Sequence, residues 1–215
     1  MFFVACSGFP VPVSRYFQEF LSVEISDTEI AIPGQGTVRR WLREAPKGFA
    51  FTVLGPKSVS ESGFRRTKDN KAACEAVAAL ATRLHAHAVV FQAPDDFKHS
   101  KAARAAVKAF LGFVPPDMPP VVLDLPAWKP ADVVKACGDR PVVAAYDPLL
   151  DDPPPASDLV YLRLPGPAGH RSRYDESSID DIAGHIRSLD AATTFCVFRN
   201  IDMQANASGL LEKLG

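Results

Sequence analysis

Hydrophobic residues gather in eight short runs along the chain, and polar segments separate them. The runs are Phe2–Cys6, Ser22–Ile25, Phe49–Leu54, Ala88–Phe91, Val121–Leu125, Val142–Ala145, Leu159–Arg163 and Thr194–Phe198. Several of them, such as Val142–Ala145, are continuously apolar instead of alternating. Continuous runs are typical of strands that are buried on both faces of a sheet. The pattern therefore predicts eight β-strands in a buried, parallel sheet.

Most of these strands are followed by a segment with helical spacing. In one segment Ala73, Val77, Leu80 and Leu84 share a helix face. Candidate N-caps for the helices are Thr37, Asp69, Ser100, Asp175 or Ser177, and Asp202. Pro130 suits the first turn of a further helix, which Gly138 ends. Strands that alternate with helices predict βαβ units.

Eight is the number of parallel strands that closes a TIM barrel, so we predict that residues 1–215 form one TIM-like (β/α)8 domain. The segment Tyr146–Ser157 holds four prolines and three aspartates, so we expect a loop in place of the sixth crossover helix. The first crossover, Val13–Phe20, is also short. An open doubly wound sheet is the alternative, and the absence of a glycine-rich phosphate fingerprint after any strand makes it less favoured.

Composition is that of a globular protein, with 47% hydrophobic and 23% charged residues. A net charge of −1 gives no overall field that would attract nucleic acid or an anionic membrane. The four cysteines form no CxxC pair, and we expect buried free thiols. With no signal-like segment or apolar run of membrane length, these features predict a cytoplasmic protein without nucleic-acid or membrane partners.

A series of short motifs resembles one known family in order along nearly the whole chain. The motifs are Val23-Glu24-Ile25-Ser26-Asp27-Thr28, Phe49-Ala50-Phe51-Thr52-Val53, Val90-Phe91-Gln92-Ala93-Pro94, Trp128, Tyr161-Leu162-Arg163-Leu164-Pro165-Gly166, Tyr174-Asp175, Phe198-Arg199-Asn200 and Ala205-Asn206-Ala207. On these motifs the chain looks like a shortened, divergent member of the domain-of-unknown-function-72 (YecE-like) family. The resemblance implies a TIM-like barrel and no established reaction.

The chain departs from the family pattern at several polar positions. Leu54 stands where the family has a lysine, Pro165 and Glu61 where it has histidines, and Glu29-Ile30 where it has Phe-Tyr. Around the fifth strand, apolar residues, Asp124 and Leu125 replace its usual glutamate, arginine and histidine. These departures indicate a changed substrate or a loss of catalysis.

In a barrel the active site lies on the loops at the C-terminal ends of the strands. Three residues near these ends are the predicted catalytic groups: Glu24, Asp124 and Asn200. Arg163 is the candidate cation for Glu24, either to hold an acid/base group or to form a structural buried ion pair. Asp124 suits a general base or a turn cap, and Asn200 suits a ligand contact or a helix N-cap.

A basic loop follows the seventh strand and carries His170, Arg171 and Arg173. Loops after strands seven and eight of TIM barrels often bind phosphate, and arginine suits phosphate through bidentate contacts. The predicted substrate-binding residues are therefore Gln92, Arg163, His170, Arg171, Arg173 and Arg199. The alternative is a solvated loop that happens to be basic.

The histidines lack HxxxH or HExxH spacing, so no metal site is predicted. A magnesium site of Glu24, Asp27 and Asp124 is a weaker alternative, and Cys6 beside Ser7 is a weak candidate nucleophile. No motif specifies a cofactor. Two functions stay open: an enzyme for a small anionic or phosphorylated substrate at the C-terminal face of the barrel, or a catalytically silent binding domain. A homodimer through the flank bared by the missing helix is a further expectation.

Overall fold

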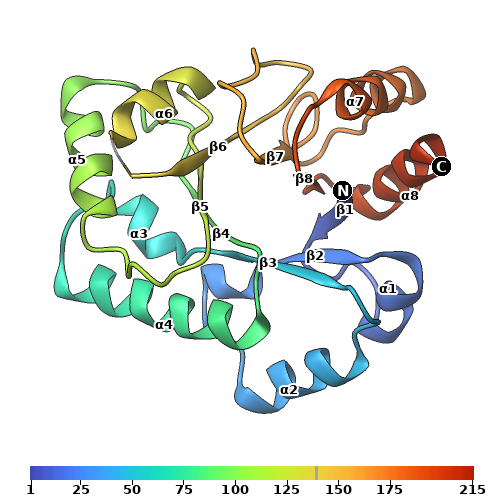
Figure 1. Ribbon diagram of the computed structural model, residues 1–215, viewed down its shortest axis with the longest axis horizontal. Coiled ribbons are helices and arrows are strands. Elements are labelled where there is room, and N and C mark those ends of the chain that lie inside the picture. Colours follow the sequence, from blue (N-terminus) through green and yellow to red (C-terminus); the bar gives the residue numbers. More distant parts are fainter. Residues whose placement is uncertain (139) are drawn as a thin grey trace.

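The computed structural model describes residues 1–138 and 140–215, and its eight strands form a closed parallel barrel in the order β1 to β8 (Figure 1). Each strand pairs in parallel with its neighbours in sequence, and β1 pairs with β8 to close the ring. The strands are β1 Phe2–Ser7, β2 Ser22–Ile25, β3 Ala50–Leu54, β4 Ala88–Gln92, β5 Val121–Asp124, β6 Val142–Tyr146, β7 Leu159–Leu164 and β8 Thr193–Phe198. The eight predicted strands and the barrel are confirmed, and the alternative of an open sheet is wrong.

Helices surround the barrel, as Figure 1 shows. The α-helices are α1 Val13–Glu19, α2 Gln35–Glu44, α3 Lys57–Glu61, α4 Lys68–Leu84, α5 Lys101–Leu111, α6 Pro130–Cys137, α7 Glu176–Ser188 and α8 Met203–Leu214, and Asp27–Glu29 forms a short 3₁₀ turn, η1. None of the helices in the part of the chain that the structure describes has the length and apolar character needed to cross a membrane.

The predicted helix starts are confirmed at some positions and wrong at others. The side chains of Ser100 and Asp175 accept hydrogen bonds from backbone amides in the first turns of α5 and α7. The prediction for Asp69 was wrong, because Thr67 caps α4. The prediction for Thr37 was also wrong, because α2 begins at Gln35, and Gly34 occupies its N-cap position. Asp202 occupies the N-cap position of α8 without capping it through its side chain.

No helix lies between β6 and β7, where every residue is described, so the predicted loss of the sixth crossover helix is confirmed. The loop that replaces it is braced by its own aspartates. Oδ1 of Asp147 accepts from the amide of Leu149 (3.0 Å), and Oδ2 of Asp151 accepts from the amide of Asp147 (3.0 Å). An apolar cavity of about 370 Å³ remains beside β6 and β7. A homodimer through this flank stays a prediction.

The barrel separates two hydrophobic clusters. The larger one lies between the strands and the helices, and the smaller one fills the barrel with Phe3, Ala5, Ala50, Leu54, Ala88, Val90, Val122, Ala145, Tyr161, Phe195 and Val197. Because side chains alternate along a strand, the inward positions that follow Val122 and Tyr161 are Asp124 and Arg163. The interior is therefore apolar at its lower layers and polar at its C-terminal mouth.

The short first crossover helix completes the seam between β1 and β2, which pair over only two residue pairs. Tyr16 of α1 is fully buried and its hydroxyl bridges the two strands. The hydroxyl accepts from the amide of Cys6 (2.9 Å) and donates to the carbonyl of Ser22 (2.8 Å). This single side chain satisfies two backbone groups that the strands leave unpaired.

We expect Tyr16→Phe to lower the free energy of unfolding by about 2–4 kcal/mol, because a buried donor and a buried acceptor each lose their partner at about 1–3 kcal/mol apiece. Urea denaturation followed by circular dichroism measures the change. An unchanged urea midpoint would show that the hydroxyl bridge does not hold the seam.

Candidate functional site

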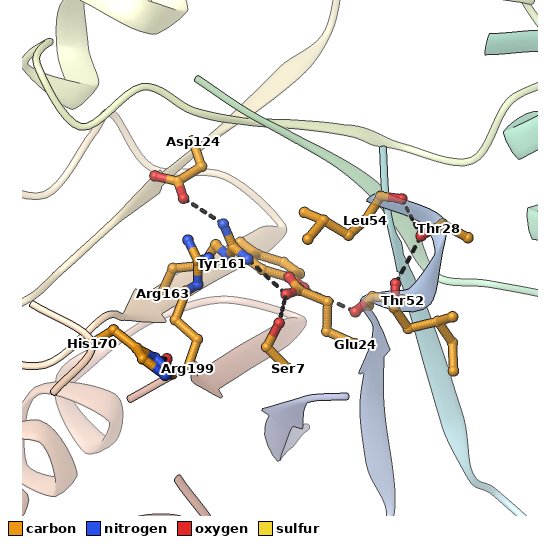
Figure 2. Close-up of polar contacts among 11 residues, drawn as sticks. Ser7, Glu24, Thr28, Thr52, Leu54, Asp124, Tyr161, Arg163, His170 and Arg199 are labelled. Carbon is orange, nitrogen blue, oxygen red and sulfur yellow. Dashed lines mark hydrogen bonds and ion pairs between the residues drawn. The ribbon is translucent and has the colours of Figure 1, made fainter. Parts of the chain in front are cut away.

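A guanidinium held between two carboxylates lies at the centre of the barrel mouth (Figure 2). Arg163 of β7 donates through Nη2 to Oε1 of Glu24 on β2 (2.6 Å) and through Nη1 to Oδ2 of Asp124 on β5 (2.5 Å). Arg163 is 3% exposed and Glu24 is fully buried. Three strands spread around the ring thus contribute to one buried charge network.

The remaining acceptor sites of Glu24 are also occupied. Ser7 Oγ donates to Oε1 (2.6 Å), and the hydroxyl of Tyr161 donates to Oε2 (3.0 Å). Thr52 Oγ1 lies 2.9 Å from the same Tyr161 hydroxyl, so it donates to that oxygen in turn. With donors on both oxygens and no exposed surface, Glu24 supports Arg163 from below and does not face the mouth.

Burial by itself would raise the pKa of Glu24, but the charge of Arg163 and the hydrogen bonds from Ser7 and Arg163 together hold the pKa below its ordinary value. For Arg163 burial disfavours the charged form, yet Glu24 and Asp124 outweigh it and raise the pKa of the guanidinium. Both groups are therefore ionised at neutral pH. The arrangement is a permanent ion pair and not a proton-transfer couple.

Above this network the mouth encloses a cavity of about 500 Å³. Its walls come from the loops and strand ends of β4 to β8. The lining residues are Gln92, Asp95, Asp124, Leu125, Pro126, Trp128, Ala145, Tyr146, Asp147, Leu150, Asp151, Arg163, Pro165, Gly169, His170 and Arg199. The cavity lies at the C-terminal face of the barrel, where TIM-barrel enzymes carry their active sites.

Arg199 follows β8 and lies beside Arg163 at this mouth (Figure 2). Its guanidinium makes no hydrogen bond or ion pair with residues 1–138 or 140–215. Burial and the neighbouring charge of Arg163 lower its pKa, against weaker opposing effects from Glu24, Asp124 and Glu29. Arg163 also has an unpartnered atom, because its Nε is buried without any partner among the described residues. The mouth thus holds two sets of unused guanidinium donors.

His170 lies at the rim of the same cavity and is fastened to the chain that carries Arg199. Its Nδ1 lies 2.5 Å from the carbonyl oxygen of Arg199, and its own carbonyl accepts from the amide of Ile201 (2.7 Å). A carbonyl oxygen only accepts, so Nδ1 carries the proton, and Nε2 donates only in the imidazolium form. The basic loop is therefore positioned by backbone contacts to the segment after β8.

Besides Glu24, three of the predicted site residues do not line the cavity. Arg171 and Arg173 are exposed outside it, and Arg173 pairs with Asp202 (2.5 Å). Asn200 is fully buried behind the loop, where its Nδ2 donates to the carbonyl of Ser172 (3.0 Å) and to Oδ1 of Asn206 (2.9 Å). The N-cap alternative for Asn200 was wrong, since Asp202 occupies that position. Of the predicted binding residues, the structure brings Gln92, Arg163, His170 and Arg199 together.

The alternative magnesium site is not assembled. Within the described residues, no group of three acidic, histidine or cysteine side chains is placed to hold a metal ion. Glu24 and Asp124 instead share Arg163, as described above. The weak candidate nucleophile also lacks the needed chemistry, because burial raises the pKa of the Cys6 thiol to about 12.

Three cavity carboxylates were not predicted. Asp95 follows β4, and Asp147 and Asp151 lie on the loop that replaces the sixth crossover helix. Burial raises the pKa of Asp147, with a smaller contribution from Asp151. Burial also raises the pKa of Asp151, with contributions from the nearby Asp124 and Asp152. The aspartates of this loop were visible in the sequence, but they only indicated a broken helix. Their place after the C-terminal end of β6 is the signal that could have found them.

Comparison with known proteins places the chain among proteins of the same fold. Residues 12–215 match the family model described as "Protein of unknown function DUF72". A comparison with curated proteins found no match.

Among solved structures, a DUF72 family protein from Enterococcus faecalis V583 superposes with a TM-score of 0.80 at 16% identity, over 100% of this chain and 95% of that chain. A DUF72 family protein from Thermotoga maritima MSB8 gives 0.73 at 17% identity, over 100% and 99% of the two chains. The structure titled SacUVDE gives 0.63 at 8% identity, over 94% and 84%. At these identities the likeness shows the shared barrel fold.

We expect Glu24→Gln to lower the free energy of unfolding at pH 7 by about 3–5 kcal/mol, because it leaves Arg163 buried with one counter-charge fewer. The pKa of Glu24 is lowered in the folded state, so its contribution is present above its ordinary value of 4.5 and is lost as the pH falls through the folded value. The difference between variant and wild type should therefore shrink as the pH falls below 4.5. Urea denaturation across this pH range measures both effects.

The matched control is Glu61→Gln, which removes an exposed carboxylate paired only with Lys57. It should change the stability by less than about 0.5 kcal/mol. Equal urea midpoints for Glu24→Gln and wild type at pH 7 would contradict a stabilising role of the buried pair.

Proposed function

The chain belongs to the DUF72 family of proteins of unknown function, and from its own residues we propose that the mouth of its barrel binds a small anionic molecule. In this proposal the guanidinium of Arg199 is the first contact of the anionic group. Arg163 and the rim histidine His170 line the same cavity and complete the basic side of the site.

The observation that carries the proposal is the unpartnered state of Arg199. A cation that is withdrawn from water beside a second cation is destabilised unless a negative group compensates it. The two carboxylates closest to hand, Glu24 and Asp124, already bind Arg163. A ligand anion at the mouth supplies the missing counter-charge, and a carboxylate or phosphate matches the planar donor array of arginine.

Whether a reaction follows binding depends on the acidic side of the cavity. Asp124 is the one predicted catalytic residue whose side chain reaches the cavity wall, and it remains the candidate acid/base group. Glu24 acts as a positioning residue for Arg163 in this proposal. Pro165 lines the cavity where the family resemblance implies a histidine, which keeps the catalytically silent alternative in place.

We expect Arg199→Met to stabilise the ligand-free protein by roughly 0.5–2 kcal/mol, because it removes an uncompensated charge from a partly buried position. The same change should abolish the thermal stabilisation that a binding anion gives. A rise in melting temperature with inorganic phosphate, sulfate or pentanoate, measured by differential scanning fluorimetry, reports binding. A ligand at a hundredfold excess over its Kd contributes about 2.7 kcal/mol.

Arg171→Met is the matched control, since it removes an exposed arginine of the neighbouring loop that does not line the cavity. This variant should keep both the basal stability and the anion-dependent rise. Three results would count against the proposal: none of the three anions raises the wild-type melting temperature, the rise persists in Arg199→Met, or Arg199→Met lowers the basal stability as a structural arginine would.

A further inference from the structure

The basic and the acidic residues that line the mouth cavity come from different parts of the barrel. The basic groups are Arg163 of β7, His170 of the loop after β7, and Arg199, which follows β8. The acidic residues lie at or after the C-terminal ends of β4, β5 and β6, and they are Asp95, Asp124, Asp147 and Asp151. A ligand that carried only negative charge would use the first sector and be repelled by the second.

The acidic sector offers acceptors and few donors. Asp124 uses Oδ2 for Arg163 and Asp151 uses Oδ2 for the amide of Asp147, and the Oδ1 atom of each has no hydrogen-bond partner within residues 1–138 and 140–215. The hydroxyl of Tyr146, a neighbouring group of the same wall, is engaged with Nε2 of His185 (2.8 Å). Ionised carboxylates only accept, so this wall calls for a ligand group that donates.

Two carboxylates of this sector, Asp147 and Asp151, also lack a cation among the described residues. Asp147 accepts hydrogen bonds from the hydroxyl of Tyr174 (3.3 Å) and the amide of Leu149, and Asp151 accepts only from a backbone amide. Neither forms an ion pair within the described chain. Burial is the main cause that raises the pKa of Asp151, and repulsion from Asp124 adds to it. A positive group placed between these side chains would relieve the repulsion.

An aromatic ring completes this side of the cavity. Trp128 follows β5 and lines the cavity, and its Nε1 donates to the carbonyl of Phe97 (2.8 Å), which fixes the orientation of the indole. The ring also stacks with Phe97 at a centroid distance of 5.8 Å. Tryptophan is the side chain that attracts cations most strongly through its ring.

We propose that the ligand of this mouth is a small zwitterion, with its anionic group on Arg199 beside Arg163 and its protonated amine on Asp151 and Asp124 beside Trp128. This inference rests on the proposed anion site and adds the class of the molecule. An ammonium group is chosen over a hydroxyl because it only donates and carries the charge that the acidic sector lacks. A cavity of about 500 Å³ suits a molecule of metabolite size.

The test uses ω-amino acids from 3-aminopropanoate to 6-aminohexanoate, so that the distance between the two charges is scanned. At the best chain length, three probes with the same carbon chain are compared with the amino acid: the carboxylate alone, the amine alone and the ω-hydroxy acid. Isothermal titration calorimetry on the full chain should show at least about tenfold tighter binding of the zwitterion than of each matched probe.

Two variants test which residues bind the amine and the carboxylate of the ligand. Asp151→Asn keeps the shape of the side chain and should remove the advantage of the amino acid over the plain carboxylate while carboxylate binding persists. Arg199→Met should weaken the amino acid and the carboxylate alike. Asp152→Asn is the matched control, because Asp152 is the exposed neighbour of Asp151 and does not line the cavity, and it should bind as the wild type does.

The outcomes separate this inference from the proposed function. If the carboxylate or the hydroxy acid binds as tightly as the amino acid, the zwitterion is wrong and the anion site stands. If the amine alone binds as tightly as the amino acid, or if no probe of the series binds, both are wrong. If Asp151→Asn leaves the preference for the amino acid unchanged, the position assigned to the amine is wrong.

Discussion

A single buried guanidinium organises the mouth of this barrel. Arg163 projects from β7 into the interior and requires a nearby negative charge, because an isolated cation there would be strongly disfavoured. Glu24 supplies it from β2 and Asp124 from β5, at 2.6 and 2.5 Å. Ser7 and Tyr161 hold the glutamate in turn. Three separate βα units are thereby tied together at the level where the interior changes from apolar to polar.

This commitment of both carboxylates sets the electrostatics of the next layer. Arg199 lies beside Arg163, and the two closest acids no longer have a free charge to offer it. The result is a guanidinium whose charged form its surroundings disfavour. Sites of this kind trade stability of the empty protein for affinity toward a ligand. Nε of Arg163 is buried and also lacks a partner among the described residues.

The loss of the sixth crossover helix has a consequence at the same mouth. A helix at this place would cover β6 and β7 from outside. The proline-rich loop instead stays near the C-terminal end of β6 and lines the cavity with Asp147, Leu150 and Asp151. Two acidic residues of the cavity therefore come from the loop that replaces the sixth crossover helix. Chain length and charge distribution are linked in this protein through one loop.

The strands and the barrel could be predicted from the sequence because strands buried on both faces leave continuous apolar runs, as in Val142–Ala145. The pairing of Glu24 with Arg163 could also be expected, since both lie in strands that close into one ring. The cavity lining could not be predicted fully, because it depends on where loop side chains turn. Arg171 and Arg173 share a loop with His170 but do not line the cavity. Asp151 lines it from a segment that only suggested a missing helix.

The most direct measurement is the ¹H–¹⁵N spectrum of the arginine Nε–H groups during titration with pentanoate, with signals assigned through arginine substitutions. If the mouth binds anions as described, the Nε–H signals of Arg163 and Arg199 shift together and saturate, while those of Arg171 and Arg173 stay in place. Movement confined to the exposed arginines, or no saturable shift of Arg163 and Arg199, would contradict an anion site above the buried ion pair.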